Sequence, residues 1–195
     1  MKTLVLTAFG LIVLATTTAS AQPGAIMLYS DNPTFTNCNL IDAAPGLLNV
    51  FVVHNFTAGA TASQFAVEEC GPFELAYLAW TAAHLVTVGG DTRTGVAVSY
   101  DTGCAVGPIL VGTIAYFGEG TTPPCAYLRV IADPAAASGQ IEGVDCGFLS
   151  TFPAGSLMSI NSDGTCFCVA GGGFPPCNPV PTEESTWGKV KSLYR

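Results

Sequence analysis

The sequence predicts an all-β fold, an Ig-like or jelly-roll β-sandwich of about ten strands that is stapled by disulfide bonds. Short runs of β-branched and aromatic residues recur along the chain, and glycine and proline separate them. No segment before the C-terminal tail shows a sustained apolar period of 3.6 residues. Eight cysteines in a chain with an export signal are typical of a disulfide framework. A closed barrel is the alternative architecture, because the order of the strands is not readable from the sequence.

The N-terminus has the three parts of a secretory signal peptide. Lys2 supplies a positive charge, residues 4–15 form an apolar run, and an A-x-A cleavage motif ends at Ala21. The apolar run is too short to hold the protein in a bilayer, and no later segment is apolar over a sufficient length. We therefore expect residues 1–21 to be removed before Gln22. The mature chain should then be exported, either secreted or held at the cell surface, with residues 22–178 as one sandwich domain.

The expected strands follow from β-branched content, alternation and flanking turns. Residues 47–56, for example, are rich in valine and phenylalanine and lie between Pro45-Gly46 and Ala58-Gly59. Asp101-Thr-Gly103 and Gly118-Glu-Gly120 are expected turns. Residues 74–84 also tolerate a helical turn. The ten strands expected on these grounds are 25–29, 47–56, 63–68, 77–88, 95–100, 109–117, 126–131, 140–144, 156–160 and 166–170.

All the cysteines are expected to form disulfides, since an oxidising compartment disfavours free thiolates. Pairing of neighbours would join 38 with 70, 104 with 125, 146 with 166, and 168 with 177, although eight cysteines allow 105 pairings. Two cysteines at i and i+2 lie on the same face of a strand, so Cys166 and Cys168 should not bond each other. Zinc is the alternative for these two and Cys177, but C-x-C is not its usual spacing. The predicted disulfide residues are Cys38, Cys70, Cys104, Cys125, Cys146, Cys166, Cys168 and Cys177.

The charge of the body is strongly negative. Between Gln22 and Val180 the basic residues are Arg93 and Arg129, against twelve acids. Such a surface repels nucleic acid and anionic lipid headgroups, so nucleic-acid binding by the body is not expected.

No catalytic, cofactor-binding or metal-binding constellation is visible, so we do not expect an enzyme. His54 and His84 each sit in an apolar run, where a histidine is most often part of a sheet. Glu68 and Glu69 are adjacent and would point to opposite faces of a strand. A secreted hydrolase of polysaccharides stays open as an alternative, because the fold could bring carboxylates such as Asp101 together with another acid, for example Glu119. A carbohydrate-binding module is the related alternative, with ring platforms among Tyr77, Trp80, Tyr100, Tyr116 and Tyr127.

The C-terminus, residues 179–195, reads as a proline-rich stalk followed by an amphipathic tail. Its large apolar residues recur at helical spacing, and three of the six basic residues of the chain lie in its last seven positions. We expect a short helix that docks against export or surface-attachment machinery or against another copy of the chain. A frayed end, or a helix folded back on its own sandwich, is the alternative. The predicted docking or sorting residues are Trp187, Gly188, Lys189, Val190, Lys191, Leu193, Tyr194 and Arg195.

Two segments carry a family resemblance. "LLNVFVVHNFTAGATASQFAV" (47–67), the scattered cysteines and the ending "STWGKVKSLYR" resemble a group of exported bacterial β-sandwich proteins that share a terminal TWG-x-x-K-x-L-Y-R tail. The portion "VFVVHNFTAGATASQF" (50–65) is similar to cohesin-like sandwiches. The resemblance implies no catalytic activity and no ligand residue. The sequence therefore predicts a non-enzymatic exported module for surface binding or structural assembly, with a C-terminal sorting or attachment tail.

Overall fold

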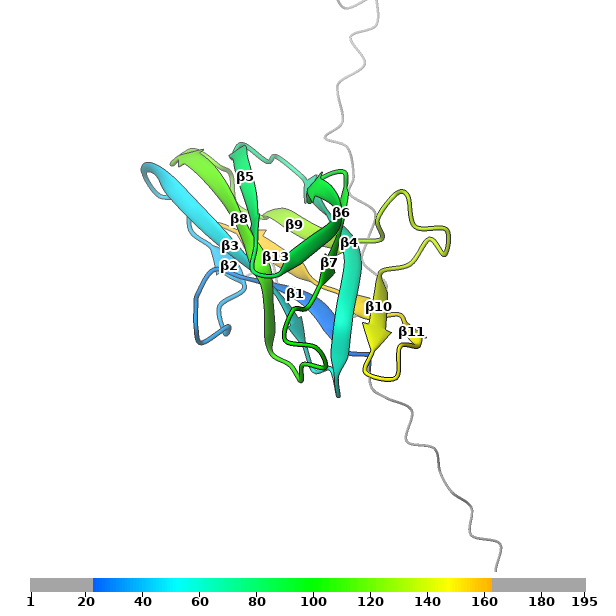
Figure 1. Cartoon of the computed structure of the whole chain (residues 1–195). Helices are drawn as coiled ribbons and strands as arrows, with labels where there is room; N and C mark the ends of the chain where they lie inside the picture. Colours follow the sequence, from blue (N-terminus) through cyan, green and yellow to red (C-terminus); the bar gives the residue numbers. More distant parts are fainter. Residues whose placement is uncertain (1–22, 163–195) are drawn as a thin grey trace, which may run out of the picture.

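A computed structural model describes residues 23–162, and in it two β-sheets form the molecule (Figure 1). One sheet has five strands in the order β12-β1-β3-β8-β5. The other contains eight, with the path β11-β10-β4-β9-β13-β2 and the β6–β7 hairpin joined to it through β4. Within residues 23–162 the chain forms no helix, so this part offers no helical membrane span.

Thirteen strands build the two sheets, several of them only two residues long. Their bounds are β1 Ala25–Tyr29, β2 Asn39–Leu40, β3 Pro45–Asn55, β4 Ala60–Cys70, β5 Ala76–Ala82, β6 Leu85–Asp91, β7 Gly95–Ser99, β8 Ile109–Glu119, β9 Ala126–Ile131, β10 Glu142–Asp145, β11 Ser150–Thr151, β12 Ala154–Gly155 and β13 Leu157–Ile160.

The all-β prediction is confirmed, and nine of the ten expected strands are present within the described residues. Residues 77–88 form two strands rather than one, because the chain turns at Ala83-His84 between β5 and β6. The helical alternative for residues 74–84 is wrong, since Ala76–Ala82 pairs along β8 as a strand. The expected strand 166–170, the signal peptide and the C-terminal tail lie outside the described residues.

The core lies between the sheets and is filled by the inward residues of each strand. Ile114 and Tyr116 of β8 and Phe65 of β4 are fully buried. The ring of Trp80 meets Phe65 edge-on at a centroid distance of 6.4 Å, and it packs over Gly112, where a side chain would collide with it. Alternation of buried and partly exposed residues along β9 shows why periodicity in the sequence located the strands.

One polar network lies inside this core. His54 is fully buried, and its Nε2 lies 2.8 Å from the carbonyl oxygen of Pro23. That contact requires a proton on Nε2, so Nδ1 accepts from the Tyr100 hydroxyl 3.0 Å away. The Tyr100 and Ser63 hydroxyls are 2.9 Å apart. His54 is therefore a satisfied core histidine that ties the N-terminal segment to both sheets, as its apolar context in the sequence indicated.

Cys104 and Cys146 form a disulfide, so the predicted pairs 104–125 and 146–166 are wrong. Neighbour pairing failed because β7 and β10 both pair with β4 near Ala62, which brings together the loops that follow those two strands. Cys125 precedes β9, which pairs with the opposite end of β4. Gly59 lies beneath the bond, and a Cβ there would come within 2.5 Å of the Cys146 sulfur. Cys38, Cys70 and Cys125 are also disulfide-bonded.

His54 should make folding stability depend on pH. Burial lowers its pKa from 6.5, and the hydrogen bond to Pro23 opposes this only in part. Below pH 6.5 the His54 imidazole is protonated in the unfolded chain but stays neutral in the folded protein. The free energy of unfolding should therefore fall as the pH drops below 6.5. The slope should approach about 1.4 kcal/mol per pH unit.

Urea unfolding at pH 7.5, 6.5 and 5.5 would test this in the wild type and in His54→Gln. The difference between the two profiles isolates His54, because the carboxylates are the same in both proteins. Profiles that run parallel across this range would contradict the assignment.

Removing the Cys104–Cys146 bond should cost about 2–4 kcal/mol of unfolding free energy, since it links residues 42 positions apart. The double variant Cys104→Ser, Cys146→Ser should show this as a lower urea midpoint. Amide exchange in residues 145–149 should also accelerate. An unchanged midpoint would show that the bond does not constrain the unfolded chain.

Candidate binding surface

The outer side of the five-stranded sheet is an uncharged face. Strands β3, β8 and β5 are paired side by side, with a register shift in β5 between Tyr77 and Ala79, and residues paired across them point to the same side. The exposed large apolar residues of these strands are Leu47, with 71% of its surface accessible, Leu78 at the irregularity in β5, with 51%, and Phe117, with 37%. We call the nine residues of three successive rows the β3–β8–β5 face: Leu47, Phe117 and Ala76; Asn49, Ala115 and Ala79; Phe51, Thr113 and Thr81.

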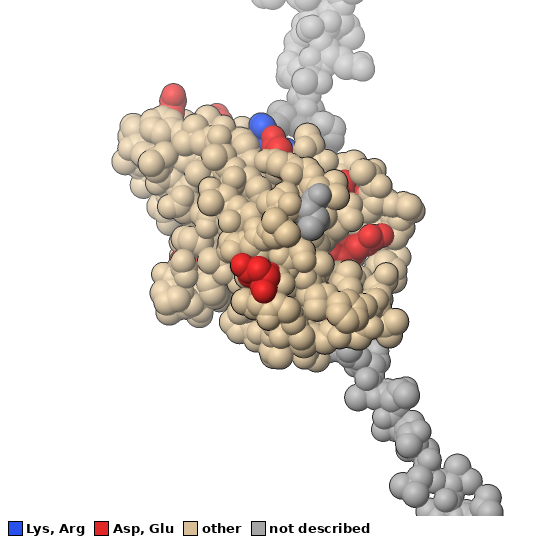
Figure 2. Space-filling view, in the orientation of Figure 1, with Lys and Arg blue, Asp and Glu red and all other residues tan. Residues whose placement is uncertain are grey.

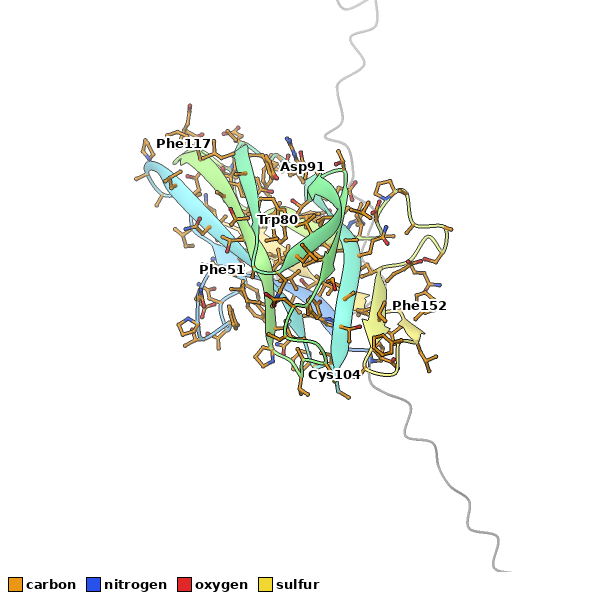
Figure 3. The ribbon with its side chains drawn as sticks, viewed as in Figure 1. Phe51, Trp80, Asp91, Cys104, Phe117 and Phe152 are labelled. Carbon is orange, nitrogen blue, oxygen red and sulfur yellow. A yellow bond between two sulfur atoms is a disulfide. The ribbon has the colours of Figure 1, made fainter. Side chains whose placement is uncertain are left out.

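This face contrasts with the charge of the rest of the body. The described residues include eleven Asp and Glu but two Arg, and none of these charged residues is in the nine-residue set. Glu119 is paired with Pro45 in the next row and marks the end of the face. Figure 2 shows one side of the molecule, on which acidic side chains form separate patches on a largely uncharged surface. Figure 3 places Phe51 and Phe117 together on the β3–β8 side, away from Phe152.

A groove of about 550 Å³ borders the face along β3. β1 pairs with β3 only from Phe51 to Asn55, whereas β8 pairs with β3 from Pro45 onward. Among the described strands none pairs with residues 45–50 of β3 on the β1 side, so this edge is open. One wall is β3, with residues 47–49 and 51, and the other is formed by residues 30–32, 37 and 39–41.

Asp31 organises the outer wall of the groove. Its carboxylate accepts hydrogen bonds from the Thr34 hydroxyl, from the Thr36 amide and hydroxyl at 3.0 Å, and from the Asn37 amide at 2.7 Å. Desolvation would raise the pKa of Asp31, but these hydrogen bonds outweigh it and lower the pKa to about 2. The groove therefore has a permanently charged carboxylate beside the apolar Ile41 and Leu47.

The described chain ends beside the same wall. The Ser162 amide donates to Asn39 Oδ1 at 2.9 Å, and Asn39 lines the groove. Asn161 fixes this position with both ends of its side chain: Oδ1 accepts from the Asp42 amide at 2.8 Å, and Nδ2 donates to the carbonyls of Asp42 and Thr122. These bonds give Asn161 a structural role.

A second apolar feature lies on the 145–149 loop of the other sheet. Phe148 and Leu149 are 81% and 66% exposed, and Phe148 has a φ of 60°, which a bulky residue rarely adopts. Asp145 Oδ1 accepts from the amides of Gly147 and Leu149, each at 2.8 Å, and Cys146 is held by its disulfide. The loop thus presents two large side chains on a braced backbone.

The carboxylates that sequence analysis considered for catalysis do not meet. Glu68 forms an ion pair with Arg129, whereas Glu69 lies on the other side of β4, where burial raises its pKa and Arg93 opposes the shift. Asp101 accepts from His84 Nδ1 at 2.6 Å in the loop before β8, and Glu119 ends that eleven-residue strand. A glycosidase needs two facing carboxyl groups, and these predicted pairs do not supply them.

Most described acids have structural partners instead. Asp42 accepts from Gly120 and Thr122, which lower its pKa against the effect of burial. Asp91 pairs with Arg93, and Asp133 accepts from Gln64 at 2.7 Å. Within residues 23–162 no group of three or more His, Cys, Asp or Glu could hold a metal ion.

The aromatic candidates for sugar binding do not form a platform. Tyr100 and Tyr116 are buried, and Trp80 points into the core. Tyr77 is covered by the Arg93 guanidinium, 3.9 Å from its ring centroid, and Tyr127 is half-buried in β9. Sequence reasoning instead missed Leu47 and Phe117, which look like core residues in an apolar strand. Their only local signal is that Leu47-Leu48 breaks the alternation, so one of the two must face outward.

Comparison with known proteins adds a distant likeness. No protein-family model matches the chain, and no curated protein matches it. Among solved structures, the sixth cohesin of scaffoldin B from Acetivibrio cellulolyticus, crystallised with a mutant Cel5 dockerin, is similar with a TM-score of 0.45 and 10% identity. The match covers 73% of this chain and 100% of the cohesin chain. At this level of similarity, no conclusion about site or partner is drawn from it.

Proposed function

We propose that the protein is an exported, non-catalytic module that binds a partner protein on the β3–β8–β5 face. The carrying observation is the nine-residue face with Leu47 and Phe117 exposed, which contains none of the eleven described acids. Exposed apolar patches rimmed by polar residues are typical of interaction sites. Export rests on the predicted signal peptide, and the C-terminal tail is proposed as the attachment element.

The chemistry of the face favours a protein over other ligands. Leu47, Phe117 and Phe51 supply apolar area, and Asn49 and Thr113 can donate or accept hydrogen bonds along the same rows. Nucleic acid and anionic lipid would be repelled by the net negative charge of the body. Because β3 and β8 pair over ten positions, the face is rigid and loses little conformational entropy on binding.

The non-catalytic part of the proposal is supported by the structural use of most of the described acids. Asp31, Asp42, Glu68, Asp91, Asp101, Asp133 and Asp145 each hold a loop, a turn or a neighbouring side chain. His54 is enclosed in the core. A polysaccharide hydrolase stays an alternative without an observation that favours it.

A charge placed on the β3–β8–β5 face should weaken the affinity for the partner protein. Leu47→Glu puts a carboxylate where the partner must exclude water, so affinity should fall at least tenfold, about 1.4 kcal/mol. Leu149→Glu is the matched control, because Leu149 is similarly exposed (66% against 71%) but lies on the 145–149 loop.

The measurement is quantitative capture of proteins from the exported fraction of the host by wild type and both variants, with urea unfolding to show that each variant is folded. A partner bound by wild type and Leu149→Glu but lost by Leu47→Glu supports the face. Loss with Leu149→Glu alone would move the site to the 145–149 loop. Equal capture by all three would refute the proposal.

A further inference from the structure

We propose that the groove beside β3 is a binding site for the C-terminal segment of the same chain, residues 182–195, which covers part of the β3–β8–β5 face until a partner displaces it. The inference rests on the proposed function, because Leu47, Asn49 and Phe51 belong to both the face and the groove. It identifies the first occupant of that surface as an amphipathic peptide whose three basic residues lie in its last seven positions.

The groove has the form and chemistry of a peptide site. It begins where β1 stops and β3 continues. A groove with apolar walls can take the apolar face of an amphipathic helix. Apolar contacts come from Ile41, Leu47 and Leu48, and Asp31 supplies a fixed negative charge.

The chain outside the structure starts at this groove. Ser162, the last described residue, is hydrogen-bonded to Asn39 in the groove wall, and Asn161 holds it there. Thirty-three residues follow. The segment therefore leaves the body next to the surface that it is proposed to cover, and not at the far end of the sandwich.

Three disulfide-bonded cysteines of the described residues lie near Ser162. Cys38, Cys70 and Cys125 are disulfide-bonded, while Cys104 is bonded to Cys146. Three is an odd number, so within one chain at least one of them must bond to a cysteine beyond Ser162, where the sequence has Cys166, Cys168 and Cys177. All three lie near the exit. Cys70 pairs with Tyr127 two residues from Cys125, and the Cys38 carbonyl accepts from Ser159.

A tether at this point makes docking within one chain the favoured arrangement. Even from Cys177, the ten residues to Trp187 reach about 33 Å when extended. A short tether gives an effective concentration in the millimolar range, far above that of a second copy in solution.

The last residues of the chain complement the groove. Trp187, Val190 and Tyr194 form one apolar stripe at helical spacing. Lys189 and Lys191 carry positive charge, which complements the negative charge of Asp31 and of the acidic body. A helix this short is only marginally stable in water, so it should form mainly when its apolar stripe packs against an apolar surface.

Trp187 reports directly on this contact. In the full mature chain, Trp80→Phe leaves Trp187 as the single tryptophan. We expect a blue-shifted emission maximum and acrylamide quenching several-fold weaker than that of the same protein in urea. Adding Leu47→Glu should shift the emission to the red and restore quenching, whereas adding Leu149→Glu should change neither.

Light scattering and dilution of the same samples distinguish docking within the chain from docking between copies. Protection that persists unchanged on dilution of a monomer supports the inference, and protection that is lost on dilution would overturn it. Exposed Trp187 in the parent protein, or protection unaffected by Leu47→Glu, would also overturn it. If Trp80→Phe does not fold, the difference spectrum between wild type and Trp187→Phe gives the same readout.

The two proposals can fail separately. Exposed Trp187 together with lost partner capture in Leu47→Glu would remove the tail contact and leave the binding face. Trp187 protected through Leu47, with partner capture unaffected by Leu47→Glu, would keep the tail contact and remove the face as the partner site.

Discussion

The pairing of β3 with β8 is the constraint on which the rest of the structure depends. Two eleven-residue strands align over ten positions, and β5 pairs with the other edge of β8, with one register shift between Tyr77 and Ala79. Because side chains alternate, that register fixes both sides of the sheet at once. Val50, Ile114 and Trp80 face the core, while Asn49, Ala115 and Ala79 form the uncharged surface outside. A slip of one residue would exchange the two sets, so core packing and the binding face are specified together.

The groove arises because β1 is shorter than β3. β1 ends at Tyr29, where Ser30-Asp31-Asn32-Pro33 turns the chain away, but β3 extends six residues further before its own pairing with β1 begins. Asp31 then orders the turn with its carboxylate. The same loop leads to Asn39, which pairs beside Ser159 and receives Ser162. The turn at Asp31, near the N-terminus, thus helps to position Ser162, the last described residue, through Asn39.

Local features were predictable from the sequence, and long-range ones were not. Strands such as Ala25–Tyr29 and Ala126–Ile131 follow directly from alternation and turn residues. The Cys104–Cys146 bond could not be predicted, because it depends on β7 and β10 both flanking β4. The order of strands in a sheet cannot be read from the spacing of cysteines along the sequence. The same limit hid the binding face, since Leu47 and Phe117 are exposed only because nothing in the described structure lies over that side of the sheet. Glu68 and Glu69, in contrast, were correctly separated by alternation alone.

The distribution of charge bears on which partners the face can accept. Two copies of the acidic body repel each other within a Debye length, which is about 8 Å at physiological ionic strength. A contact between the faces of two copies would bring acidic residues of both bodies within that distance. Glu119 would stand at the edge of such a contact on both sides. A neutral face on an acidic protein therefore disfavours self-association while leaving apolar contact open to an oppositely charged partner. The last seven residues of the chain, which include Lys189, Lys191 and Arg195, have this character. A partner that displaces them must offer comparable apolar area without adding negative charge.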